Sequence, residues 1–220
     1  DPATKLYYVE VQEPDMHEQS GDLERLSQAL NATFDLPALA CDIRVLSKLQ
    51  PTPRKGKWAV TVAVHQAHEN SQPRLLDLWP GYYEGTIYGL AVDLGSTTIA
   101  AHLCDLRTGD VLASAGVMNP QIRFGEDLMS RVSYVMMHPE GTEAMMAAVR
   151  EGLNGLLAEV ALDGGVTTDD ILEISLVGNP IMHHILLGIN PIELGGAPFA
   201  LATDEAVNSY ASELDLAIDS

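Results

Sequence analysis

The sequence is poor in the residues that several classes of protein require. It has 12 Lys and Arg against 31 Asp and Glu, which gives a net charge of −19. Proteins that bind the phosphate backbone of nucleic acids need basic patches to displace counterions, so we expect no nucleic acid as a partner. The same excess of acid opposes docking on an anionic membrane surface. No signal peptide and no apolar run long enough to span a bilayer is present, which predicts a cytoplasmic protein without a membrane partner.

Cysteine is also scarce. The two cysteines, Cys41 and Cys104, lie far apart, and no CxxC pair exists. A disulfide framework and a four-cysteine metal site are therefore excluded within these residues. Both cysteines stand among apolar residues, which favours buried, unreactive side chains.

Residues 1–87 read as a small α+β domain without a recognisable catalytic cluster. Alternating apolar residues predict strands over 5–14, 57–65 and 74–81. Leucines at helical spacing predict a helix over 20–34, with Ser20 or Gly21 as N-cap, and a shorter helix follows over 41–50. The segment PTPRKGK (51–57) is expected to interrupt regular secondary structure and to hold a local cationic cluster.

Residues 88–220 have a different order of elements. Three short apolar segments separated by tight turns, the first ending at Asp93 and the others spanning 98–106 and 111–118, predict an antiparallel meander. A helix over 125–138, a long helix with Thr142 as N-cap, a strand over 171–179 and a short helix opening at Pro180 follow. A weak helix is expected between residues 204 and 214.

This order predicts one lobe of the ribonuclease-H-like, actin-like ATPase fold, with a mixed sheet. A doubly wound dinucleotide fold needs parallel strands from its start, and neither GxGxxG nor GxxxxGK[ST] is present. The predicted fold class is thus α+β for residues 1–87, followed by an α/β lobe over residues 88–220.

The turn after the first strand of this lobe has the chemistry of a phosphate site. In GLAVDLGSTT, Gly95 lets backbone approach a ligand closely, and Ser96, Thr97 and Thr98 add hydroxyl donors beside the backbone N–H groups of a tight turn. Asp93 would be repelled by phosphate, but it is placed to hold Mg²⁺ through water molecules. An ordinary hairpin turn is the alternative.

Several motifs together resemble one family. GLAVDLGSTT resembles the first phosphate motif of the acetate and sugar kinase and actin superfamily. With MNPQIRFGEDLMSRVSYV, LVGNPIMHHILLGINP and LGGAPF, it resembles the reductive activators of corrinoid proteins. Residues 1–87, with the DLERL helix and the KWAVTV strand, resemble the middle domain of that family, and residues 88–220 resemble the first lobe of its actin-like domain.

The resemblance implies an ATP-dependent activator. Such a protein returns the Co(II) corrinoid of a methyltransferase partner to Co(I), with an electron from a plant-type [2Fe–2S] domain. The four cluster cysteines are missing here, and the second lobe is not recognisable. The sequence is therefore expected to be a fragment that binds ATP and Mg²⁺ weakly or not at all and is inactive alone.

Two further polar residues have alternative interpretations. Asp127 is a candidate catalytic carboxylate near the metal, or else an acidic residue at a helix N-terminus that pairs with Arg131. Asn179 ends the fourth strand and is a candidate phosphate or water contact, or else a helix N-cap, and both roles are compatible.

The adjacent residues His183 and His184 invite a metal or corrinoid-ligand interpretation. Neighbouring helical residues point about 100° apart, so the two side chains cannot easily share one metal. We expect one buried, hydrogen-bonded histidine and one at the surface.

Two other functional classes stay open. One is a small-molecule kinase of the same superfamily, for which Asp127 is the one candidate base found. The other is a non-enzymatic, actin-like scaffold that serves homodimerisation or partner docking.

Overall fold

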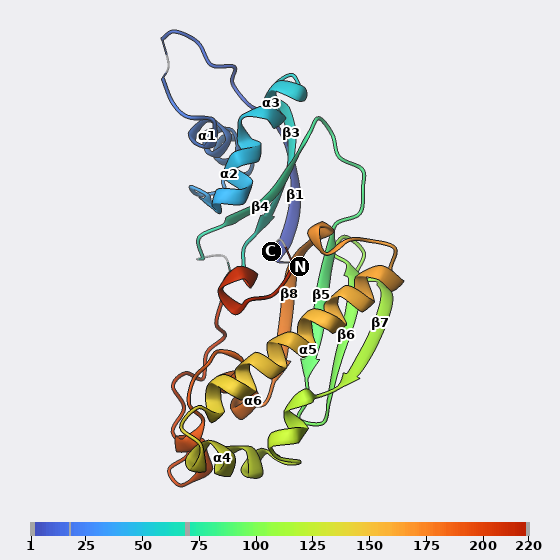
Figure 1. Ribbon diagram of the computed structural model, residues 1–220. Coiled ribbons are helices and arrows are strands. Elements are labelled where there is room, and N and C mark those ends of the chain that lie inside the picture. Colours follow the sequence, from blue (N-terminus) through green and yellow to red (C-terminus); the bar gives the residue numbers. More distant parts are fainter. Residues whose placement is uncertain (1–2, 18, 69–70, 219–220) are drawn as a thin grey trace. The chain divides into compact units, whose positions relative to one another are not determined.

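The computed structural model describes residues 3–17, 19–68 and 71–218, and it divides into two compact units, Asp1–Thr86 and Ile87–Ser220 (Figure 1). Each unit has a four-stranded sheet and a hydrophobic core of its own. The two units are described separately below.

The sheet of the first unit has the order β1-β3-β4-β2. Strands β1 (Thr4–Glu10), β3 (Ala59–His65) and β4 (Arg74–Pro80) pair antiparallel, and the two-residue strand β2 (Ala40–Cys41), which was not predicted, pairs parallel to β4. Strand β3 begins two residues later than predicted because Lys57 and Trp58 are left-handed, with φ of 52° and 68°. Such backbone cannot continue a strand.

Two helices, α1 (Asp22–Phe34) and α2 (Ile43–Leu49), supply apolar side chains to the core of this unit. A third helix, α3 (Pro51–Lys55), follows and buries Thr52 and Pro53. The prediction that residues 51–57 only interrupt regular secondary structure was wrong, since Pro51 opens α3, a position where the missing N–H of proline costs nothing. Helix α1 begins after Gly21, which has no side chain with which to cap it.

The sheet of the second unit has the order β7-β6-β5-β8. Strands β5 (Tyr88–Leu94), β6 (Thr98–Asp105) and β7 (Val111–Met118) form the predicted antiparallel meander. Strand β8 (Ile171–Gly178) pairs parallel to β5, which makes the sheet mixed, as predicted. Gly109 in the turn between β6 and β7 has φ of 81°, a conformation that glycine adopts without strain.

The helical segments of this unit lie mainly between β7 and β8 and after β8. The α-helices are α4 (Leu128–Met137), α5 (Gly141–Asp163) and α6 (Pro180–Leu186), and the 3₁₀ turns are η1 (Pro120–Phe124), η2 (Thr168–Asp170), η3 (Ile192–Gly195) and η4 (Ala211–Leu214). Helix α5 begins at Gly141, so Thr142 lies inside it and is not the predicted N-cap. The weak helix expected up to residue 214 is reduced to η4. Within the described residues, no helix combines the length and apolar character needed to cross a membrane.

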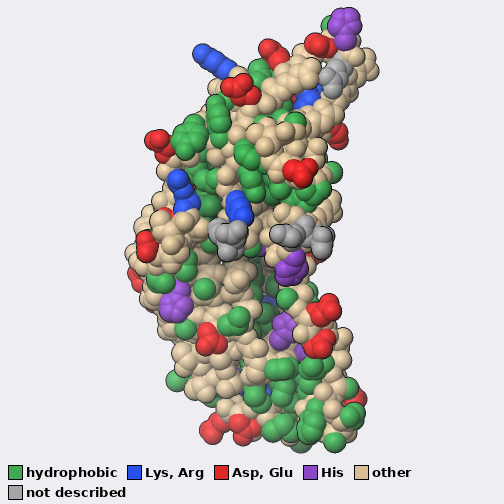
Figure 2. All heavy atoms as spheres, turned by 180° about the vertical axis from the view of Figure 1, so that it is seen from behind, with side chains coloured by type: hydrophobic (Ala, Val, Ile, Leu, Met, Phe, Trp, Pro, Cys, Tyr) green, Lys and Arg blue, Asp and Glu red, His purple; other side chains and the backbone are tan. Residues whose placement is uncertain are grey.

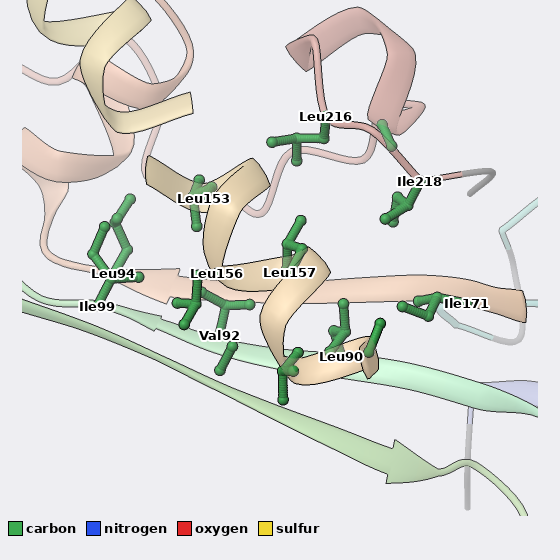
Figure 3. Close-up of a cluster of buried hydrophobic side chains, with 14 of the residues drawn as sticks. Leu90, Val92, Leu94, Ile99, Leu153, Leu156, Leu157, Ile171, Leu216 and Ile218 are labelled. Carbon is green, nitrogen blue, oxygen red and sulfur yellow. The ribbon is translucent and has the colours of Figure 1, made fainter. Parts of the chain in front are cut away.

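The long helix α5 covers one face of the second sheet (Figure 1). Leu153, Leu156 and Leu157 of this helix pack with Leu90 and Val92 of β5 (Figure 3). Side chains that alternate along β5 and recur at helical spacing along α5 meet in this core. The C-terminal segment joins it through Leu216 and Ile218.

The opposite face of the second sheet is open. Ala91 and Asp93 of β5, Ser114 of β7 and Ser175 of β8 are all exposed there. From behind, the second unit shows mostly backbone and uncharged side chains, with scattered acidic and histidine side chains (Figure 2). The candidate phosphate loop therefore follows a strand that is buried on one side only.

A partly buried cluster of charged side chains in the first unit leads to a prediction about how stability depends on pH. Asp22 accepts hydrogen bonds from Arg25 at 2.7 Å and from Arg54 at 2.8 Å, which joins α1 to α3. Partial burial alone would raise the pKa of Asp22, but hydrogen bonds from Arg54 and Arg25 outweigh it and hold the pKa below its ordinary value of 3.8. A carboxylate whose pKa is lowered by folding stabilises the fold at pH values above its unfolded-state pKa. This contribution is lost as the pH falls through the folded-state pKa.

We therefore expect Asp22→Asn to lower the free energy of unfolding of the first unit by about 1 kcal/mol at pH 7. The difference from wild type should shrink as the pH falls below about 4. Both tryptophans, Trp58 and Trp79, lie in the first unit, so tryptophan fluorescence during urea unfolding reports on it. Glu24→Gln removes the same charge from an exposed position of α1 and should have a smaller effect; equal effects would contradict the assigned role of Asp22.

Candidate functional site

The predicted phosphate segment forms the short connection between β5 and β6. Strand β5 ends at the buried Leu94, residues 95–97 form the connection, and β6 begins at Thr98. A Cβ atom at position 95 would lie 2.3 Å from the carbonyl oxygen of Thr98. The turn is thus so tight that only glycine fits at Gly95. We call residues 95–97 the 95–97 loop.

All three carbonyl groups of the 95–97 loop are held by the protein interior. Asn119 Nδ2 donates to the carbonyl of Gly95 at 2.8 Å, and the Asn119 backbone N–H donates to the carbonyl of Thr97 at 2.8 Å. The guanidinium Nη2 of Arg131 donates to the carbonyl of Ser96. The loop is therefore anchored from behind at every residue.

The donors of the loop remain available. In the part of the chain that the structure describes, the backbone N–H groups of residues 95–97 and the hydroxyls of Ser96, Thr97 and Thr98 have no hydrogen-bond partner in the protein. Successive N–H groups that converge on one point form a nest for an anion, and neighbouring hydroxyls add donors. The donor set fits phosphate oxygens.

Asp93 lies on the open face of the sheet, two residues before the 95–97 loop. It pairs with Ala100 of β6 and Val177 of β8, and its side chain is exposed. Small neighbours leave the carboxylate accessible to solvent and to a hydrated cation. An exposed carboxylate beside N–H and hydroxyl donors that have no protein partner fits Mg²⁺ held through water.

Asn179 follows directly on the strand that ends beside β5. Gly178 pairs with Leu94, so the carboxyl ends of the parallel strands β5 and β8 meet at the same edge of the sheet. The side chain of Asn179 accepts a hydrogen bond from the Met182 N–H at 3.1 Å and caps α6. The N-cap interpretation thus describes its contact within the protein, while its amide Nδ2 has no described protein acceptor.

Asp127 is the N-cap of α4. Its carboxylate accepts from the Ser130 backbone N–H at 2.7 Å, and this hydrogen bond is the main reason that the pKa of Asp127 lies below its ordinary value. The pair with Arg131 that helical spacing suggested is not a direct ion pair, because Arg131 turns inward and contacts the 95–97 loop. Asp127 is linked to the loop only through the first turn of α4.

The anchoring residues are the part of the site that the sequence analysis missed. Asn119, Gln121 and Arg131 are all fully buried, with exposed fractions of 0%. Asn119 Oδ1 accepts from the Gln121 N–H at 2.9 Å, Gln121 Nε2 donates to the Met145 carbonyl at 3.0 Å, and Gln121 Oε1 accepts from Arg131 Nη1 at 3.2 Å. The available signal was the pair of polar residues Asn119 and Gln121 within the quoted motif.

The two histidines of α6 have separate surroundings. His184 is buried, with Nδ1 at 2.8 Å from the Pro180 carbonyl and Nε2 accepting from the Ala202 N–H at 3.0 Å. His183 is only partly buried, and burial, followed by the charge of His184, lowers its pKa. Among the described residues, no group of three or more His, Cys, Asp or Glu could hold a metal ion.

Comparison with protein families matches both units. Residues 88–220 match the model of the RACo middle region, and residues 1–85 match the model of the RACo linker region. Residues 1–87, which were predicted to resemble the middle domain, thus match the family's linker region over 1–85. Residues 88–220, which were predicted to resemble the first lobe of the actin-like domain, match its middle region.

Two relatives are similar over the whole chain. The corrinoid activation enzyme RamQ of Eubacterium limosum is 29% identical over 221 residues, which cover 100% of this chain and 36% of RamQ. A solved structure described as a reductive activator for corrinoid, iron-sulfur protein superposes with a TM-score of 0.86 at 29% identity, covering 100% of this chain and 34% of that one. The chain spans about a third of the length of these relatives, and its fold is that of the solved one.

The anchoring of the 95–97 loop leads to a stability prediction. Asn119→Ala would leave the Gly95 carbonyl and the Gln121 N–H without buried partners, so we expect the second unit to lose about 2–4 kcal/mol of unfolding free energy. Amide hydrogen exchange along α5, followed by mass spectrometry, measures this unit separately from the first.

Asn154→Ala is the matched control. Asn154 also makes two hydrogen bonds, to Asp215 and Ala217, but in a solvent-accessible place. We expect a loss below about 1 kcal/mol there, because water replaces the missing partner. A loss as large as that of Asn119→Ala would show that the loop anchors are not specially costly to remove.

Proposed function

Because the chain belongs to the RACo family, we propose that the protein acts in the ATP-dependent reductive activation of a corrinoid protein. In the proposed reaction, one electron from a reduced [2Fe–2S] cluster passes to the Co(II) corrinoid of a methyltransferase partner. The cluster is oxidised by one electron and the cobalt becomes Co(I). The family match over both units and the activities named for the two relatives support this proposal.

The observation that carries the nucleotide part of the proposal is the 95–97 loop. Its carbonyl groups are anchored inward, and its N–H and hydroxyl groups are left for a ligand. In the proposed function, Gly95, Ser96, Thr97 and Thr98 bind phosphate oxygens, and Asp93 holds the Mg²⁺ that accompanies them. Bound ATP supplies the free energy that makes the electron transfer feasible.

The cluster is proposed to lie outside residues 1–220. A [2Fe–2S] cluster needs four cysteine ligands, and Cys41 and Cys104 belong to different units. Burial, helped by the charge of Asp42, raises the pKa of Cys41 to about 11, and burial raises the pKa of Cys104. Both side chains are therefore thiols at neutral pH.

The cleanest test of the site is Asp93→Ala in the full-length protein. We expect ATP-stimulated formation of Co(I), followed by its absorbance, to fall about ten- to a hundredfold, the range typical when a residue that orients a metal's bound ligands is removed. Glu159→Ala removes an exposed carboxylate of α5 and should leave the rate unchanged. An unchanged rate in Asp93→Ala would refute the metal-side role of this carboxylate.

Two observations separate this function from the alternatives. A CxxxxCxxC segment elsewhere in the same polypeptide supports the electron donor, and its absence would contradict the activator. Titration of the full-length protein with Mg·ATP that shows no binding would instead favour a docking scaffold over any nucleotide-dependent enzyme.

A further inference from the structure

Arg131 is a fully buried cation that contacts only neutral acceptors. Its Nε donates to the Gly125 carbonyl at 3.0 Å, its Nη1 contacts Gln121 Oε1 at 3.2 Å and Met182 Sδ at 3.1 Å, and its Nη2 donates to the Ser96 carbonyl. Among the described residues, no carboxylate forms an ion pair with it. Burial lowers the pKa of the guanidinium, and the charge of Asp127 opposes that shift, but arginine stays protonated.

Burying the charge of Arg131 without an ion-pair partner destabilises the folded state. Moving an uncompensated charge out of water costs several kcal/mol even after relaxation, as a general rule for buried ions. Residues 87–220 contain four arginines and no lysine against 19 Asp and Glu, so cations are rare in this unit. One of these few cations lies directly behind the 95–97 loop.

The second buried arginine of the unit shows the ordinary solution. Arg150 of α5 donates to the Leu186 carbonyl and also to the carboxylate of Asp215 at 2.7 Å. Its charge is thus compensated by an acid of the same chain. Arg131 has no such ion pair among the described residues, and the charge of Asp127 acts on it without a direct contact.

The orientation of the peptide groups connects Arg131 to the ligand side of the loop. Among the described residues, the only cis peptide bond is Ala197–Pro198, so the Ser96–Thr97 peptide is trans and its C=O and N–H point in opposite directions. Arg131 donates to that carbonyl from the interior, which directs the Thr97 N–H outward. A donor on the carbonyl polarises the peptide and strengthens its N–H as a donor.

We propose that Arg131 is a positioning residue of the 95–97 loop, and that its buried charge makes the site selective for a polyphosphate over a neutral ligand. The inference rests on the proposed nucleotide function and adds the source of its charge selectivity. Asn119 fixes the loop by neutral hydrogen bonds, whereas Arg131 fixes it and also supplies a positive potential in a dry environment, where charge acts strongly.

The test compares three variants of the full-length protein by equilibrium binding of Mg·ATP and of adenosine. We expect Arg131→Met to weaken Mg·ATP binding about ten- to a hundredfold, the range for a lost hydrogen bond to a charged group, with a much smaller effect on adenosine. Arg150→Met, the matched buried control, should lower the melting temperature but leave the dissociation constant for Mg·ATP within about twofold of wild type.

Arg131→Lys supplies a readout that a purely structural role would not move. A buried lysine loses its proton more readily than arginine, so Mg·ATP binding to this variant should weaken progressively from pH 6.5 to pH 9, while wild type follows no such trend. This measurement also serves if Arg131→Met does not fold.

The outcomes distinguish the two proposals. Wild-type protein that binds no Mg·ATP refutes the proposed function and this inference with it. If the wild-type protein binds Mg·ATP, three results overturn the role of Arg131 and leave the proposed function standing. In the first, Arg131→Met weakens the binding of Mg·ATP and of adenosine equally, and in the second it weakens neither. In the third, Mg·ATP binding to Arg131→Lys has the same pH profile as binding to wild type.

Discussion

The inward anchoring of the carbonyl groups of Gly95, Ser96 and Thr97 is the constraint on which the candidate site depends. A nest exposes its N–H groups only if the opposite carbonyls have partners, since buried polar groups without partners are costly. Those partners are Asn119, the N-cap of η1, and Arg131 of α4. They are held in turn: Gln121, which bonds to Asn119, donates to α5, and Arg131 contacts the sulfur of Met182 in α6. One hydrogen-bonded network therefore ties the loop to all three helices of the unit.

The 95–97 loop follows a strand that is covered on one face of the mixed sheet and exposed on the other. Parallel strands are ordinarily covered on both faces, yet the parallel pair β5 and β8 is covered by α5 on one face and open on the other. The open face carries Asp93, and the covered face carries the core that holds β5 in place. The carboxylate can thus meet a hydrated cation while the strand that bears it stays rigid, which is what a preorganised site needs.

Local patterns predicted the strands other than the two-residue β2, and they predicted the candidate loop, but not the residues that hold it. Short apolar segments separated by tight turns predicted the meander, a fourth strand was expected over 171–179, and the mixed-sheet fold class is confirmed. Helical spacing suggested that Arg131 pairs with Asp127, yet tertiary contacts turn it towards Ser96, 35 residues earlier in the sequence. Asn119 similarly reaches Gly95 across 24 residues. Such contacts depend on how η1 and α4 pack against each other and against α5, which no local periodicity encodes.

In the proposed function, the net charge of the protein and the local potential at the 95–97 loop have opposite signs. A strongly acidic unit repels a polyphosphate at long range, and repulsion of that kind mainly slows association. At contact, however, a charge in a dry interior acts more strongly than charges at the solvated surface. In the proposed function, Arg131 supplies positive potential from behind the 95–97 loop, and Mg²⁺ supplies it from the side of Asp93. The acidic surface then disfavours anions in general, while the loop accepts the one class of anion that arrives with its own divalent cation.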